Sequence, residues 1–194
     1  MRARPYATTS PTRLAAALLE VAARIGLDGA SVREVASHAG VSIGAVQHHF
    51  PTKDEMLAYS FRSLAERVLT RLSTVDPDID PARTLFAALS QLLPLDEQRT
   101  AEAHVMAAFT VRAATSPSLS TIRHTTLFTM RTAVSAVLIR MGTAEAETRA
   151  ALLLAAVNGL ALDAIASPEL YPPEYLTHAL HTQIQLSLDG ADAR

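Results

Sequence analysis

Residues 32–51 read Val-Arg-Glu-Val-Ala-Ser-His-Ala-Gly-Val-Ser-Ile-Gly-Ala-Val-Gln-His-His-Phe-Pro, and this stretch decides the fold. A small side chain at Ala36 allows two helices to cross closely, and Gly40 tolerates the positive φ of a tight turn between them. The hydroxyl of Ser42 can cap the second helix. Four apolar side chains are spaced to fill the angle between the helices: Val35, Ala39, Val41 and Val46. The stretch predicts a helix-turn-helix, a motif that places its second helix in the major groove of DNA.

Helix start signals occur on both sides of this stretch. Serine and proline at positions 10 and 11 open a first helix that runs to Gly26. Its predicted apolar face consists of Leu14, Leu18, Val21 and Ile25. Two residue pairs have the spacing of a capping box and open helices over 32–39 and 53–73: Ser31 with Glu34, and Thr52 with Glu55.

The rest of the chain carries signals for five more helices. They are predicted from Asp80-Pro81 to near Pro94, from Asp96 to about Thr115, from Ser116-Pro117 to Met141-Gly142, from Thr143 to near Ser167-Pro168, and from Pro172-Pro173 to near Asp189-Gly190. No alternating apolar run is bounded by Asn-Gly or Asp-Gly, which argues against strands. We therefore expect an all-α fold of about nine helices.

The longest apolar run, residues 150–166, is interrupted by Asn158, Gly159 and Asp163. A membrane span needs about 20 mainly apolar residues, so we predict that this run falls short of one. A helix that is apolar on all sides must be covered, and we expect it to be buried in the protein, with no membrane partner.

The charge of the chain is unevenly distributed. Residues 1–53 hold six basic and three acidic side chains, a net +3, whereas the remainder holds 11 basic and 16 acidic, a net −5. A positive N-terminal segment on an acidic body is typical of a small nucleic-acid-binding domain joined to a domain that does not bind nucleic acid. Arg2, Arg4 and Tyr6 precede the first helix, as a minor-groove arm or as a disordered tail.

The stretch from Leu14 to Leu57 resembles the DNA-binding domain of the TetR family of bacterial regulators. The resemblance rests on four segments: Gly26-Leu27, Val32-Arg33-Glu34-Val35-Ala36, Ala39-Gly40-Val41-Ser42 with Gly44, and Phe50-Pro51-Thr52-Lys53-Asp54-Glu55-Met56-Leu57. Residues 158–162, Asn-Gly-Leu-Ala-Leu, are similar to a segment of betaine-regulator-like members. The resemblance implies a DNA-binding domain over residues 1–52 and a ligand-sensing and dimerisation domain over residues 53–194.

Carried onto this sequence, the resemblance implies that the exposed face of the recognition helix consists of Ser42, Ile43, Gly44, Ala45, Gln47 and His48. Gln47 can pair with adenine, and Ile43 and Ala45 can contact a thymine methyl group. Many family members carry Tyr at the position of Gln47, so this residue contacts either a base or nothing. Arg33, Thr52 and Lys53 are candidate phosphate contacts, because free amides and a cation at a helix start favour anions. His49 repeats the spacing of Val46 and is expected to be structural.

The resemblance also implies a small-molecule effector and a homodimer. Candidate pocket residues, with ordinary core packing as the alternative, are Met106, Phe109 and Phe128 as walls and His104, Arg112 and Asn158 as polar anchors. The last two helices are expected to form the dimer interface, unless a monomer buries both faces internally. Their apolar residues are Leu152, Leu153, Ala156, Leu160, Leu176, Leu180, Ile184 and Leu188.

Other kinds of chemistry find little support. Cysteine is absent, and neither a Gly-x-Ser-x-Gly elbow nor a phosphate-binding glycine loop occurs. Glu174, His178 and His181 share one face of the last helix, but such helical sets are usually surface residues and we assign no metal or cofactor. We expect a cytoplasmic, dimeric, ligand-responsive repressor of transcription that binds double-stranded DNA. Activation of transcription is left open as an alternative to repression. The alternative is an all-α small-molecule carrier or enzyme that does not bind DNA.

Overall fold

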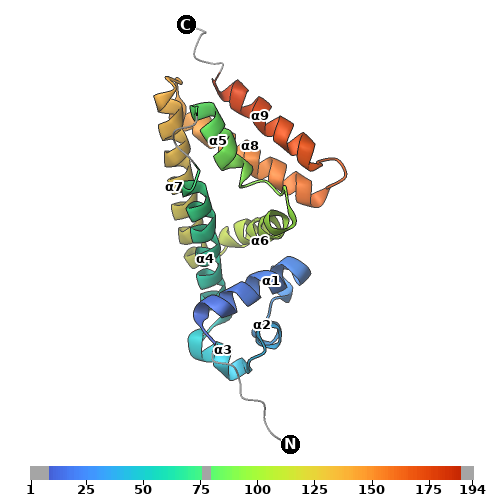
Figure 1. Ribbon diagram of the computed structural model, residues 1–194. Coiled ribbons are helices and arrows are strands. Elements are labelled where there is room, and N and C mark those ends of the chain that lie inside the picture. Colours follow the sequence, from blue (N-terminus) through green and yellow to red (C-terminus); the bar gives the residue numbers. More distant parts are fainter. Residues whose placement is uncertain (1–8, 76–79, 189–194) are drawn as a thin grey trace, which may run out of the picture. The chain divides into compact units, whose positions relative to one another are not determined.

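The computed structural model describes residues 9–75 and 80–188, and every regular element within them is a helix (Figure 1). The nine helices are α1 (Pro11–Gly29), α2 (Val32–Ala39), α3 (Ile43–His49), α4 (Lys53–Ser73), α5 (Pro81–Ser90), α6 (Glu97–Ala113), α7 (Pro117–Arg140), α8 (Ala146–Ala166) and α9 (Pro173–Leu188). The predicted all-α class and the predicted order of helices are confirmed for this part of the chain. Arg2, Arg4 and Tyr6 lie outside the described residues.

The chain forms two compact units. Unit 1 comprises residues 1–66 and 104–122, and unit 2 comprises residues 67–103 and 123–194. Helices α4, α6 and α7 each contribute residues to both units. Unit 1 thus contains α1, α2 and α3 complete, and unit 2 contains α5, α8 and α9 complete.

Helix α1 is interrupted where its glycine was expected to end it. Gly26 has φ +77° and ψ 162°, and one further helical turn follows to Gly29. Leu14, Leu18 and Val21 are fully buried, but the prediction that Ile25 joins them is wrong, because its side chain is 46% exposed. The interruption directly after Ile25 turns the chain, and Leu27 fills the core instead.

The start of α8 was also predicted incorrectly. Thr143 was expected to cap this helix, but its backbone N–H donates to the carbonyl of Leu138 at 3.0 Å, and the N–H of Gly142 donates to Ile139 at 2.9 Å. With Gly142 at φ +73°, these bonds form the Schellman motif that ends α7. Thr143 therefore belongs to the preceding turn, and α8 begins three residues later at Ala146.

Helix α8 is less covered than its apolar sequence suggested. It is long and apolar enough to cross a membrane by length and composition, with a mean hydropathy of 1.6, whereas the run of residues 150–166 was predicted to be too short. Only 28% of the apolar 18-residue window of α8 is buried within the chain, so the prediction that the helix is buried is wrong for one side. That side carries Leu152 and Leu162, which are 61% and 53% exposed.

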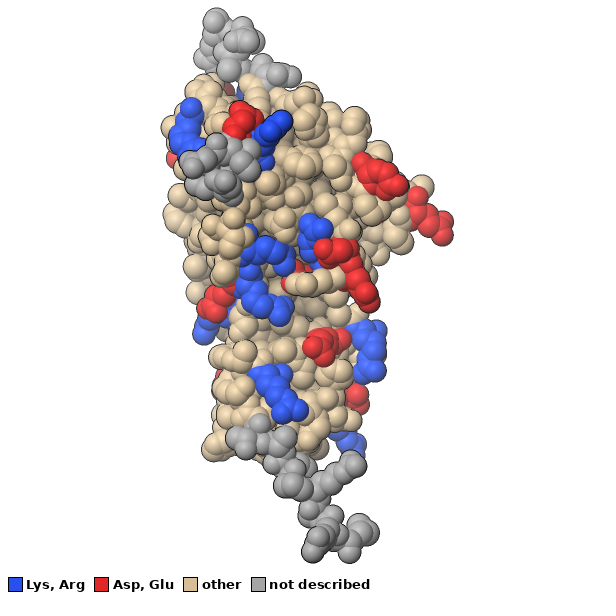
Figure 2. Space-filling view, in the orientation of Figure 1, with Lys and Arg blue, Asp and Glu red and all other residues tan. Residues whose placement is uncertain are grey.

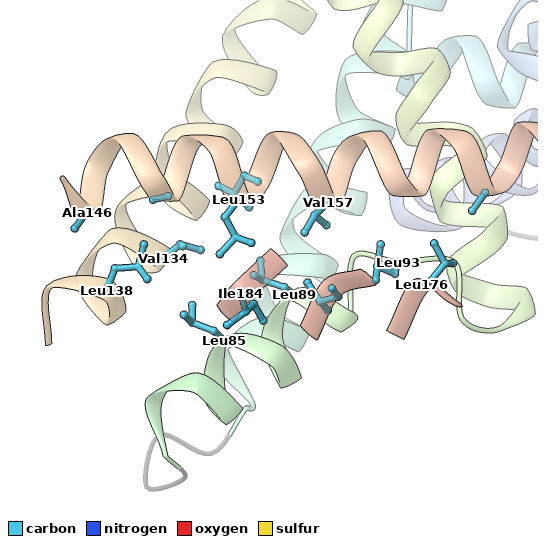
Figure 3. Close-up of a cluster of buried hydrophobic side chains, with 14 residues drawn as sticks. Leu85, Leu89, Leu93, Val134, Leu138, Ala146, Leu153, Val157, Leu176 and Ile184 are labelled. Carbon is cyan, nitrogen blue, oxygen red and sulfur yellow. The ribbon is translucent and has the colours of Figure 1, made fainter. Parts of the chain in front are cut away.

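The core of unit 2 forms where α5, α7, α8 and α9 bring their leucines together (Figure 3). Leu85 and Leu89 of α5 lie beside Ile184 of α9, and Leu153 and Val157 project from α8 toward them. Burying one such side chain stabilises the fold by about 1.5–3 kcal/mol, so this cluster is the main source of stability for the unit. Four residues that were predicted for the dimer interface are buried in this core instead: Leu153, Leu176, Leu180 and Ile184.

Two arginines hold the C-terminal end of α5. Arg71 of α4 donates to the carbonyl of Gln91 at 3.1 Å, and Arg99 of α6 donates to the carbonyl of Ser90 at 3.1 Å. Arg71 also pairs with Glu102 at 2.8 Å, a contact in which the two side chains are only 25% and 11% exposed. Positive charge at a helix C-terminus is favourable because it satisfies carbonyls that have no partner within the helix.

The same contacts fix the charge state of Glu102. Burial by itself raises the pKa of this carboxyl, but hydrogen bonds from Arg71 and Gln98 and the charges of Arg71 and Arg67 outweigh it, and the pKa lies below 4.5. A lowered pKa means that the ionised form stabilises the folded state.

We predict that Glu102→Gln lowers the free energy of unfolding by roughly 2 kcal/mol at neutral pH, because it leaves the guanidinium of Arg71 with a weaker acceptor. Urea unfolding measures the change. The stabilisation should be complete above the ordinary pKa of a glutamate and should be lost as the pH falls through the lowered pKa of this carboxyl. Glu66→Gln, an exposed change on α4, serves as the control and should cost less than about 0.5 kcal/mol. Equal losses in the two variants would contradict the assignment.

Candidate nucleic-acid interface

The corner between α2 and α3 has the geometry that the sequence predicted. Gly40 adopts φ +68° and ψ 33°, its N–H donates to Ser37, and the N–H of Val41 donates to Ala36 at 3.0 Å. These bonds form a second Schellman motif, and only a residue that tolerates the left-handed region fits it without strain. Ala36 is 2% exposed, so its small side chain occupies the contact between the helices.

Apolar packing and caps hold this corner. The four side chains predicted to fill the angle, Val35, Ala39, Val41 and Val46, are all buried. Ser42 caps α3 by accepting a hydrogen bond from the N–H of Ala45 at 3.1 Å. Helix α3 is therefore a rigid segment whose orientation is set by α2.

Each predicted capping box forms only one of its two characteristic hydrogen bonds. Ser31 accepts from the N–H of Glu34 at 3.2 Å, but its own N–H donates to the carbonyl of Gly29, so the return bond is not formed. Thr52 accepts from the N–H of Glu55 at 3.1 Å, while the carboxylate of Glu55 accepts from the Thr52 hydroxyl. Each helix start is capped by one hydroxyl.

The outer face of α3 is open to solvent. Ile43, Gly44, Gln47 and His48 are exposed, and Ser42 and Ala45 are partly buried. His49 is half-buried, its Nε2 donates to the carbonyl of Thr9 at 3.2 Å, and its ring lies 6.5 Å from that of Phe50. The structural role predicted for His49 is confirmed. The exposed residues present amide, imidazole and aliphatic groups, which are the groups that read base edges in a major groove.

Lys53, at the start of α4, also binds backbone carbonyls, which the sequence did not indicate. The Nζ of Lys53 lies 3.5 Å and 3.4 Å from the carbonyls of Leu27 and Asp28 at the end of α1. An ammonium group has three donors, so one remains for an anion. Arg33 and Thr52 are exposed.

Helix α1 makes two further polar contacts with α2 that sequence reasoning missed. Arg13 donates to the carbonyl of Ala39 at 3.0 Å, and His38 pairs with Glu20 at 2.6 Å. No local pattern points to these pairs, because their members are 26 and 18 residues apart.

Comparison with known proteins identifies the family of this chain. Residues 14–59 match the model of bacterial regulatory proteins of the tetR family, and residues 81–189 match that of the C-terminal domain of BetI-type transcriptional repressors. The chain belongs to the TetR family. It is a ligand-responsive transcriptional regulator, and this family of DNA-binding proteins is not enzymatic, so the alternative of a carrier or enzyme is not favoured.

Individual TetR-family relatives span most of the chain. The HTH-type transcriptional regulator PksA of Bacillus subtilis is 32% identical over 162 residues, which cover 80% of this chain and 78% of PksA. A transcriptional regulator of Rhodococcus sp. Rha1 is 72% identical, with a TM-score of 0.92 over 96% of this chain and 100% of that one. A regulator of Saccharomonospora viridis, solved in complex with choline, shares the fold with a TM-score of 0.84 at 17% identity over 90% of this chain and 95% of that one.

The residues predicted to line an effector pocket fall in both units of this TetR-family protein. In unit 1, Phe109 is buried with its ring stacked 4.0 Å from Phe61, Arg112 lies 3.6 Å from Asp54, Met106 is partly buried and His104 is exposed. In unit 2, Phe128 is 63% exposed and Asn158 is exposed. Their role in binding an effector stays a prediction.

Charge on the surface is mixed. Figure 2 shows basic and acidic side chains interspersed over the face in view. Two of the six basic residues counted for the N-terminal segment, Arg2 and Arg4, lie outside the described residues. Among the residues described, no set of three or more His, Asp or Glu side chains could hold a metal ion.

The two glycines of the corner should respond to alanine in opposite directions. A Cβ at Gly40 meets nothing within 4 Å, so Gly40→Ala suffers only from its φ of +68° and should cost about 1 kcal/mol. Gly44 lies in α3 with 3.9 Å to its nearest neighbour, so Gly44→Ala should stabilise by about 0.5 kcal/mol.

Thermal unfolding of the two glycine variants beside the wild type measures both signs. Gly40→Asn should lose less than Gly40→Ala, since Asn tolerates the left-handed region better. Loss of stability in Gly44→Ala equal to that in Gly40→Ala would contradict this account.

Proposed function

We propose that this TetR-family protein is a cytoplasmic repressor that binds a palindromic or pseudopalindromic operator as a dimer and is released by a small-molecule effector. The observation that carries the proposal is the rigid corner at Gly40, which leaves the outer face of α3 exposed. The match of residues 81–189 to the C-terminal domain of BetI-type repressors supports repression over activation.

We assign the DNA contacts as follows. Gln47 and His48 contact base edges, and Ile43 and Ala45 contact thymine methyl groups or sugars. Ser42 and Gly44 approach the sugar-phosphate backbone of the DNA. Arg33, Thr52 and Lys53 bind phosphates. The remaining ammonium donor of Lys53 and the free amides at the start of α4 support its assignment.

We assign the two functions to two parts of the chain. We assign residues 1–52 to DNA binding and residues 53–194 to effector sensing and dimerisation. The N-terminal family match, at 14–59, supports the first assignment and extends into α4, and the match at 81–189 supports the second. Effector binding shifts α4, and with it the separation of two DNA-binding domains in the dimer. The stacked rings of Phe61 and Phe109 in unit 1 support α4 as the moving element, because they tie it to α6.

The outer face of α8 is the surface we assign to dimerisation. Leu152, Ala155, Gly159 and Leu162 are exposed and lie at helical spacing along one side. The small residues allow a second backbone to approach closely, since a Cβ at Gly159 meets nothing within 4 Å. Leu186 of α9, at 62% exposure, adds apolar surface. Packing against a second copy of the chain is more favourable for this apolar side than exposure to water.

DNA binding is tested by the retention of genomic fragments in a mobility assay. Gln47→Ala should lower affinity for the retained fragment about tenfold, which corresponds to the loss of one bidentate base contact, and leave binding to unrelated DNA unchanged. Adding Lys53→Ala should weaken binding to all DNA and reduce the slope of log affinity against log salt by about 1.

Gln98→Ala, an exposed change in α6, should leave the wild-type affinity unchanged and serves as the control. A wild-type protein that retains no fragment would contradict the proposed function. Normal binding by Gln47→Ala would remove only the assignment of Gln47.

Sedimentation equilibrium tests the dimer. We expect the wild type to sediment as a dimer and the double variant Leu152→Glu with Leu162→Glu to sediment as a monomer, because two buried carboxylates per subunit would lose their hydration. Val111→Glu, at a position 75% exposed on α6, should remain dimeric. A dimeric double variant would place the interface elsewhere.

A further inference from the structure

Residues 9–13, which are the first residues of α1 and the two residues before it, contact α2, α3 and α4. Arg13 donates to the carbonyl of Ala39, the last residue of α2, at 3.0 Å. The carbonyl of Thr9 accepts from His49, the last residue of α3, at 3.2 Å. The hydroxyl of Thr12 lies 3.4 Å from that of Tyr59 on α4. Residues 9–13 therefore act as one anchor for three helices.

The two contacts from Arg13 and His49 bracket the segment that carries the recognition helix. Ala39 lies immediately before the left-handed turn at Gly40, and His49 ends α3. A segment fixed at both ends to residues 9–13 cannot rotate about the corner without breaking one of the two hydrogen bonds. Its orientation thus depends on side chains that lie outside the helix-turn-helix motif.

The Arg13 contact uses one guanidinium N–H group to bind the end of a helix. The carbonyl of Ala39 belongs to the last turn of α2, where carbonyls lack partners within the helix and carry partial negative charge. A guanidinium hydrogen bond to such a group is charge-assisted and stronger than a neutral one. Arg13 reaches this carbonyl from a helix 26 residues earlier in the chain, so the contact also closes the domain.

We propose that Arg13 is a positioning residue for operator recognition, which fixes the angle of α3 through the carbonyl of Ala39 and does not bind phosphate. The inference rests on the proposed function of this protein as a DNA-binding regulator. It makes operator specificity depend on α1, which itself contacts no base. His49 performs the same task at the other end of α3 through the carbonyl of Thr9.

Two kinds of DNA separate a positioning role from a phosphate contact. The probes are the genomic fragment retained by the wild type and a scrambled fragment of the same length and composition. Arg13→Met should lower affinity for the retained fragment 10- to 30-fold, change affinity for the scrambled fragment less than twofold, and leave the salt slope unchanged. Arg13→Lys, which keeps a donor for the carbonyl, should recover most of the lost ratio of specific to non-specific affinity.

A phosphate contact would behave differently. It would lower affinity for both fragments in parallel and reduce the salt slope by about 1 in Arg13→Met, and this result would overturn the proposal. An unchanged affinity for the retained fragment would overturn it as well. Arg24→Met removes an exposed charge from the same helix and is the matched control for electrostatics.

A second pair of variants keeps the test decisive if Arg13→Met does not fold. His49→Gln retains a donor for the carbonyl of Thr9, whereas His49→Leu does not, so only His49→Leu should lose the ratio of specific to non-specific affinity. Equal ratios in these two variants would count against the proposal.

Hydrogen exchange of residues 43–49 without DNA tests the positioning contact independently of any operator. It should be at least fivefold faster in Arg13→Met than in Arg24→Met. Equal rates would overturn the proposal even if the wild type retained no genomic fragment, a result that would separately refute the proposed function.

Discussion

The left-handed turn at Gly40 is the constraint on which the DNA-binding end of this protein depends. With φ at +68°, it lets the N–H groups of Gly40 and Val41 satisfy the final carbonyls of α2 while the chain reverses toward Ser42. A residue with a Cβ would strain this conformation, and a longer turn would separate Val35 from Val46 in the core. The exposed face of α3 follows from that single backbone conformation.

Charged side chains in this protein repeatedly bind helix C-termini. Arg13 and Lys53 donate to the ends of α2 and α1 in unit 1, and Arg71 and Arg99 donate to the end of α5 in unit 2. Each contact adds a charged donor to a carbonyl at the end of a helix, and each joins two helices. Apolar packing drives the association of the helices, and these contacts select one arrangement among those that bury a similar area.

The sequence predicted the nine helices because their signals are local. Caps at Ser10, Ser31, Ser42 and Thr52 lie within three residues of the amides that they accept from, and apolar spacing identifies most core residues of the helix-turn-helix. Two of the errors also have local causes. Ile25 left the core because Gly26 interrupts α1 directly after it, and Thr143 did not cap α8 because it completes the Schellman motif of α7.

The amino-acid sequence by itself determined the fold class and the corner at Gly40, since each depends on neighbours within a few turns of helix. It also predicted four of the residues that α3 exposes, Ile43, Gly44, Gln47 and His48, whereas Ser42 and Ala45 are partly buried. Only the tertiary structure decided which apolar residues of α8 and α9 remain exposed, and which carbonyls Arg13 and Lys53 bind. The physical reason is distance along the chain: a guanidinium or ammonium group can serve any carbonyl or phosphate within reach, and only the packed helices fix which one that is.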